Sequence, residues 1–245
     1  MSALAAFLIA IGVADLVRTI ARPRALPPIA AVLAVAAVAV LAAHDSPGAG
    51  VMMLLAAAGA VTWLLLNQRP DGEVLALAVF GVTTLVLFAG GGWAGRADGL
   101  LGDWMRGSPF PAVTRADPDH LLLAFGLVLV QLATGNTIVR LVLGAIGAIK
   151  PGPAPQASDE LRGGRLLGPM ERLFILGLGM AGQVTAASLV IAAKGLIRFP
   201  ELQAKRNERE SVTGVGIDEI TEYFLVGSFV SWLVALSGLA AYSLV

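Results

Sequence analysis

Cysteine is absent from this 245-residue sequence, and histidine occurs only twice. The lack of cysteine excludes disulfide bonds, thiolate nucleophiles and cysteine-ligated metal sites. The two histidines, His44 and His120, each lie beside an aspartate in an expected connection between helices. We therefore expect no metal site and no cofactor.

Charged residues are also scarce, at 14% of the chain, whereas soluble domains contain about 25%. Lys and Arg together number 17, as do Asp and Glu, so no basic excess indicates a nucleic-acid partner. Hydrophobic residues make up 57% of the chain and the mean hydropathy is +0.80. They occur in long unbroken runs, which predict an integral membrane protein with the lipid bilayer as its main partner.

Motifs of known catalytic sites are missing from the sequence. It contains no Walker motif, no GxSxG, no HExxH and no acidic cluster suited to a metal diphosphate. The glycine-rich runs at 90–92 and 177–182 are not phosphate loops, because no strand is expected before them and no GK[ST] follows. We therefore expect that the protein is not an enzyme.

Seven apolar runs predict an all-α fold, a polytopic transmembrane helical bundle with six or seven spans in a single domain over residues 1–245. The predicted helical segments are approximately residues 3–20, 29–43, 51–67, 74–89, 120–149, 173–193 and 220–244. A polar, proline-rich linker is expected at 150–163.

The long connection at 90–119 contains one short amphipathic pattern. Four apolar residues follow helical spacing on one face: Leu100, Leu101, Trp104 and Met105. Tryptophan is enriched where membrane meets water, so we expect a short interfacial helix in this loop.

The sixth segment, 173–193, decides the topology. As a single span, it places 9 of the 17 Lys and Arg residues on the cytoplasmic side, which gives no orientation by the positive-inside rule. As a re-entrant hairpin, it moves the basic loop at 194–209 across and changes the division to 14 and 3. Glycines 177, 179 and 182 lie where a hairpin would turn. We favour the single span, because runs of this length ordinarily cross.

Two groups of polar residues are candidate sites. The first consists of intramembrane residues that could form an ion pair or line a pathway: Asp15, Arg18, Asn136 and Arg140. An Asp15–Arg140 pair is expected at similar depth in their helices. A structural ion pair, or an arginine that reaches the headgroups, is the alternative role.

The second group flanks the sixth and last segments and could bind a lipid phosphate or another anion: Arg165, Glu171, Arg172, Lys194, Arg198, Glu222 and Tyr223. Glu171 and Lys194 can meet only if the segment turns back, because a continuous helix would separate them by about 35 Å. The alternative role for these charges is to fix the depth of the helices.

The last segment carries small residues at every fourth position, namely Gly227, Ser231 and Ala235. This pattern favours close packing of membrane helices. We expect the packing to be within one molecule, although contact with a second copy also fits the pattern.

Several stretches in residues 119–245 resemble a family of uncharacterised polytopic membrane proteins of bacteria, of the actinobacterial type. They are QLATGNTIVRLVL, GRLLGPMERL, AAKGLIRFPEL and TEYFLVGSFVSW. The resemblance implies a multi-pass protein of the bacterial inner membrane. It implies no substrate, cofactor or catalytic residue.

Three functions remain open from the sequence. The first is a non-enzymatic accessory subunit that binds another membrane protein or a second copy of itself. The second is a small transporter or channel that uses Asp15, Asn136 and Arg140. The third is a protein that binds a lipid or an anionic ligand near Glu171, Lys194 and Arg198.

Overall fold

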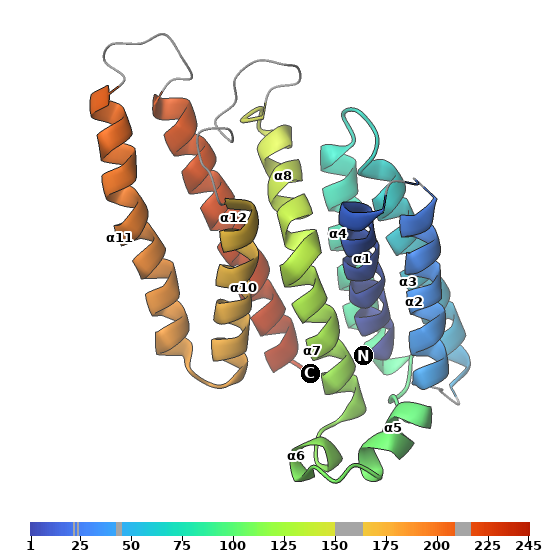
Figure 1. Ribbon diagram of the computed structural model, residues 1–245. Coiled ribbons are helices and arrows are strands. Elements are labelled where there is room, and N and C mark those ends of the chain that lie inside the picture. Colours follow the sequence, from blue (N-terminus) through green and yellow to red (C-terminus); the bar gives the residue numbers. More distant parts are fainter. Residues whose placement is uncertain (22, 24, 43–45, 150–163, 209–216) are drawn as a thin grey trace. The chain divides into compact units, whose positions relative to one another are not determined.

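The described part of the chain folds mainly into helices (Figure 1). The computed structural model describes residues 1–21, 23, 25–42, 46–149, 164–208 and 217–245, and none of these residues forms a strand. The all-helical class predicted from the sequence is therefore confirmed. The chain divides into two compact units, Met1–Thr134 with Leu244–Val245, and Gly135–Ser243.

Five helical stretches in the described residues are long and apolar enough to cross a membrane. They are Ser2–Ile20, Gly48–Leu66, Glu73–Gly92, Pro118–Ala145 and Thr221–Ser243. The apolar helix Leu26–Leu41 and the apolar part of another, Val184–Leu196, are shorter. The length and composition of these helices support the prediction of a membrane protein.

The first unit is built around α1 (Ser2–Ile20). This helix packs against α2 (Leu26–Leu41), α3 (Pro47–Leu66) and α7 (Pro118–Leu129). Its residues from Ser2 to Gly12 are all buried. A helix that is apolar on every side is expected to be enclosed by others, and the alanine-rich sequence of α1 lets its neighbours approach closely.

Aromatic side chains join α1 to α3 and α4 (Glu73–Ala89) within this unit. The rings of Phe7 and Phe80 lie 6.0 Å apart, and those of Trp63 and Phe80 lie 5.4 Å apart. Phe7 and Trp63 are fully buried. These contacts give α4 a packed inner side, whereas most of its surface remains exposed.

The connection after α4 contains the 3₁₀ turn η1 (Gly90–Gly92) and two short helices, α5 (Gly99–Arg106) and α6 (Pro111–Thr114). Met105 of α5 is buried, while Leu100 and Trp104 are exposed. The backbone N–H of Ala97 donates to Asp119 Oδ2 at 3.0 Å, which holds the connection against the start of α7. A helix thus forms at the predicted place, and its position at a membrane surface stays a prediction.

The helix α7 continues without a loop through a π-helical turn, η2 (Val130–Thr134), into α8 (Gly135–Ala145). The π turn packs against α1 in the first unit. The boundary between the two compact units falls directly after it, at Gly135.

The second unit contains α8, α10 (Gly164–Met180), α11 (Val184–Glu208) and α12 (Ile217–Ser243). The linker predicted at 150–163 lies outside the described residues. The single helix that we favoured over 173–193 is wrong, because the chain turns at 181–183 and forms a helical hairpin of α10 and α11 (Figure 1).

The hairpin turn has a clear local cause. Gly182 has a φ of +75°, a conformation that other residues adopt only with strain. The N–H of Gln183 donates to the carbonyl of Leu178 at 2.8 Å, and Gln183 in turn accepts from the N–H of Ala187 at 3.0 Å. These bonds satisfy backbone groups at the end of α10 and the start of α11.

Candidate functional site

The side chain of Arg172 lies in the interior of the second unit. Only 1% of its surface is exposed. Its Nη1 donates to Ser231 Oγ at 2.9 Å, and its Nη2 donates to Asn136 Oδ1 at 2.8 Å. One guanidinium group on α10 therefore links α8 to α12 through charge-assisted hydrogen bonds.

The dipeptide Gly135–Asn136 at the start of α8 makes room for this guanidinium. A Cβ atom on Gly135 would lie 2.5 Å from Arg172 Nε and 2.7 Å from Cζ, closer than van der Waals contact allows. Glycine thus admits the flat face of the arginine, and the next residue supplies a hydrogen-bond acceptor.

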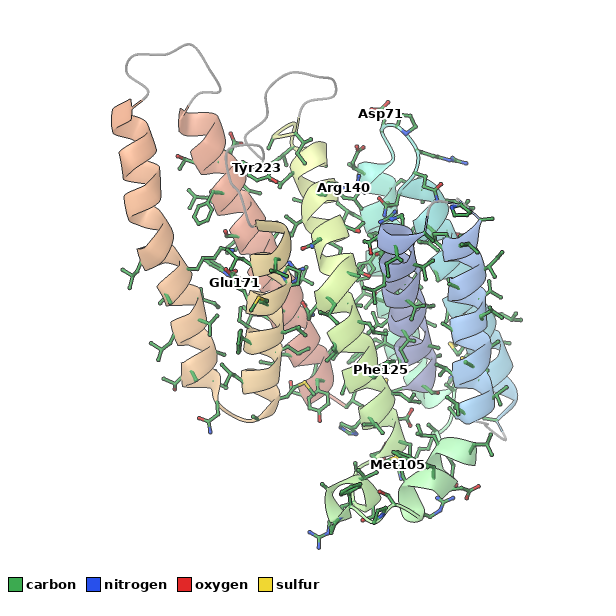
Figure 2. The ribbon with its side chains drawn as sticks, viewed as in Figure 1. Asp71, Met105, Phe125, Arg140, Glu171 and Tyr223 are labelled. Atoms are coloured by element: carbon green, nitrogen blue, oxygen red, sulfur yellow. The ribbon has the colours of Figure 1, made fainter. Side chains whose placement is uncertain are left out.

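A second charged contact lies beside Arg172, across the hairpin. Lys194 Nζ on α11 is 2.6 Å from Glu171 Oε2 on α10, and 16% of each side chain is exposed. Glu171 projects from α10 on the side of α11 (Figure 2). The ammonium group is also 5.9 Å from the centre of the Phe224 ring on α12, within the range of a cation–π contact.

The contacts of α12 give the depth of this site along the helices. Ser231 is at the middle of the 23-residue apolar stretch Thr221–Ser243. Near the hairpin turn, Gly179 lies beside Leu239, towards the end of α12. The Arg172–Ser231 and Gly179–Leu239 contacts show that α10 and α12 run parallel. The Glu171–Lys194 pair therefore lies between the levels of Phe224 and Ser231, within the length of the apolar stretch.

The structure brings together three of the residues predicted to bind a lipid or an anion, namely Glu171, Arg172 and Lys194. Glu222 is exposed, and Tyr223 is half-buried near the upper end of α12 in Figure 2. The side chains of Arg165 and Arg198 lie outside the described part of the chain.

The predicted intramembrane group is distributed over both units. Within the first unit, Asp15 is buried and its Oδ1 accepts a hydrogen bond from Arg18 Nη2 at 2.8 Å. Within the second, Asn136 accepts from Arg172, and Arg140 lies one turn further along α8. Since Asp15 and Arg140 belong to different units, the predicted Asp15–Arg140 pair stays a prediction.

Sequence reasoning did not assign Ser231, Gly135 or Phe224 to the site. Ser231 was noticed only as part of a stripe of small residues, and that stripe does pack within the unit: Ser231 and Ala235 are buried. A hydroxyl group in such a stripe is the signal that could have indicated a hydrogen bond to an intramembrane charge.

The site offers hydrogen-bond donors and one carboxylate. In the described residues, no group of three His, Asp or Glu side chains is placed to hold a metal ion. Searches with this chain find no matching protein-family model, no matching curated protein and no matching solved structure. A proposal for the function therefore has to be argued from the residues of the site.

Proposed function

We propose that the protein is a small membrane transporter or channel whose pathway passes the Glu171–Lys194 pair in the second unit. The observation that carries this proposal is the position of Glu171, Arg172 and Lys194 within the length of the apolar stretch of α12. Insertion of one charged side chain at the centre of a membrane helix costs about 2.5–3.5 kcal/mol, and such residues commonly mark solute or proton pathways.

The three charged side chains differ in their exposure to solvent, and this difference indicates different roles. Arg172 is enclosed, and its hydrogen bonds to Asn136 and Ser231 hold α8, α10 and α12 together. Glu171 and Lys194 retain 16% exposure each. The pair, rather than the arginine, is the part of the site that a solute can reach.

The accessory-subunit hypothesis has less specific support. Exposed apolar side chains on α4 and α12 are compatible with a partner protein. However, the same side chains are needed wherever a helix faces lipid. The charged cluster inside the second unit has no such general explanation.

We further propose that both arms of the hairpin cross the membrane. They have 17 and 25 residues, or about 25 and 37 Å at a rise of 1.5 Å per residue. The protein would then have eight crossings: α1, α2, α3, α4, α7 with α8, α10, α11 and α12.

Eight crossings give a consistent orientation. Only three of the 17 Lys and Arg residues, Arg96, Arg106 and Arg115, fall on the side of the chain termini. Of the other 14, Arg172 and Lys194 lie within the membrane and the remaining 12 fall towards the opposite side. The positive-inside rule then places the termini outside the cytoplasm. In a bacterial inner membrane, α5 would lie on the outer surface with Leu100 and Trp104 in the headgroup layer.

Uptake into liposomes tests the transport proposal. Purified protein is reconstituted, and uptake is measured for isotope-labelled phosphate, lactate, succinate, choline and spermidine. We expect uptake of at least one solute above that of protein-free liposomes. Lys194→Met should reduce it about tenfold, equivalent to about 1.4 kcal/mol, while Arg106→Gln, at the exposed end of α5, should not.

A charge-swapped variant guards against a folding artefact. Glu171→Lys combined with Lys194→Glu keeps an ion pair across the hairpin but exchanges its partners. If this variant and Lys194→Met both elute as folded protein and transport at the wild-type rate, the pair is not in the pathway. If none of the five solutes enters, the transport proposal is wrong for these classes of solute.

A further inference from the structure

We propose that the transported solute is a small anion and that Glu171 couples its binding to the uptake of one proton. This inference rests on the transport function proposed above and assigns a solute class to the same site. It follows from the charges that surround the Glu171–Lys194 pair and from the accessibility of each.

The described side chains at the site carry more positive than negative charge. Arg172 and Lys194 are cations, and the one carboxylate is that of Glu171, which contacts Lys194 and precedes Arg172 in α10. Asn136 and Ser231 contribute neutral polar groups. An environment with this balance favours an anion over a cation, because a third cation beside Arg172 and Lys194 would be repelled in a medium of low dielectric.

The other charged or titratable side chains described on the four helices are Arg140, Glu222, Tyr223 and Tyr242. Arg140 is one turn beyond Asn136 on α8. Glu222 and Tyr223 are at the start of α12, and Glu222 is exposed. The carboxylate that contacts Lys194 is Glu171, at 2.6 Å, so protonation of Glu171 is the change that acts directly on the ammonium group.

The coupling consists of an exchange of partners at Lys194. A proton from water binds to Glu171 Oε2, and the ion pair is replaced by a neutral carboxylic acid beside an ammonium group. An oxygen of the solute anion then accepts the hydrogen bond from Lys194 Nζ that Glu171 had accepted. One proton and one negative charge enter together, so a monovalent anion moves without net charge. The only covalent bonds that change are the O–H bonds of the transferred proton.

Two neighbours of Lys194 assist this exchange. The Phe224 ring, 5.9 Å from Nζ, attracts the ammonium group in either state and keeps it near the site. Arg172 is closed to the solute by its burial, yet its charge remains close by and stabilises an anion at Lys194.

A proton-flux assay tests the coupling. Liposomes containing the protein and a trapped pH dye receive an inward lactate gradient, with potassium and valinomycin holding the membrane potential at zero. We expect faster acidification of the lumen than in protein-free liposomes, together with uptake of labelled lactate. Phosphate and succinate gradients are tested in the same way.

Three variants assign the proton and the anion to their residues. Glu171→Gln should lose the solute-driven acidification about tenfold while labelled anion still exchanges at a rate within about threefold of wild type. Lys194→Met should lose both acidification and anion exchange. Arg106→Gln, at the exposed end of α5, should behave as wild type.

The outcomes separate this inference from the transport proposal. If anions enter without acidification, if choline or spermidine is taken up instead, or if Glu171→Gln acidifies the lumen like wild type, the protein transports but the coupling inference is wrong. If no solute moves with the wild-type protein, the transport proposal fails and the inference fails with it.

Discussion

A buried arginine is costly unless its donors are satisfied, and the environment of Arg172 shows how this is achieved. Asn136 and Ser231 accept hydrogen bonds from two different terminal nitrogens of the same guanidinium group. The planar fork of arginine can reach two acceptors on separate helices, which a lysine ammonium group cannot reproduce in the same positions. The side chain thus acts as a specific connection among three helices.

Replacement of Arg172 by lysine should destabilise the second unit. The variant leaves Asn136 and Ser231 without their guanidinium donors, and each unsatisfied buried polar group costs about 1–3 kcal/mol. We expect a lower melting temperature for detergent-solubilised Arg172→Lys. Arg106→Lys, whose side chain is 60% exposed, should melt like wild type. Equal melting temperatures for all three proteins would contradict the proposed role of Arg172.

At the scale of elements, the hairpin of α10 and α11 determines which residues can meet. A continuous helix over 173–193 would hold Glu171 and Lys194 about 35 Å apart, whereas the observed pair is separated by 2.6 Å. The turn at Gly182 is therefore responsible for the charged site. A Cβ atom added at Gly182 would have no atom of the described residues within 4 Å, so the role of this glycine is in the backbone conformation.

Gly182→Ala should weaken the hairpin through this conformation alone. A side chain at a φ of +75° costs about 1–2 kcal/mol, with no steric contact to add to it. Gly177→Ala is the matched control, because it lies within helix α10 and also has open space at its Cβ position. Thermal unfolding should show a loss of stability for Gly182→Ala only. A similar loss for both variants would indicate that the turn is not special.

At the scale of the whole molecule, the hairpin changes the expected topology. The six or seven spans predicted from the sequence counted residues 173–193 once. If both arms cross, the number of crossings would be even, and the start and the end of the chain would lie on one side. The basic residues at 194–209 would then join those at 162–172 on the other side, and the nearly equal division of charge would disappear.

Labelling of single cysteines in intact bacterial cells tests this topology, and the natural absence of cysteine removes background. A membrane-impermeant thiol reagent should reach Gln183→Cys at the hairpin turn and Ser108→Cys from outside. Asn207→Cys should react only after permeabilisation. If Gln183→Cys stays unlabelled even then, the hairpin ends inside the membrane. Labelling of Asn207→Cys in intact cells would reverse the proposed orientation of the C-terminal half.

Much of the helical architecture was accessible from the sequence because long apolar runs have few solutions in lipid. The backbone of such a run must satisfy its own hydrogen bonds, so helices are expected wherever these runs occur. The same reasoning could not locate the break at 181–183. Glycine is common in packed membrane helices as well as in turns, and Gly182 differs from Gly177 only in a backbone angle that neighbouring structure selects.

By itself, the sequence of this protein determined the solvent and the class of structure. Composition and run length indicated a helical membrane protein, because burial of so many apolar residues requires lipid or a larger core. Only the tertiary structure decided that Arg172 meets Asn136 and Ser231, and that Glu171 meets Lys194. These partners are 23 to 59 residues apart in the chain. Their pairing depends on the direction of each helix after its turn, which local sequence patterns do not specify.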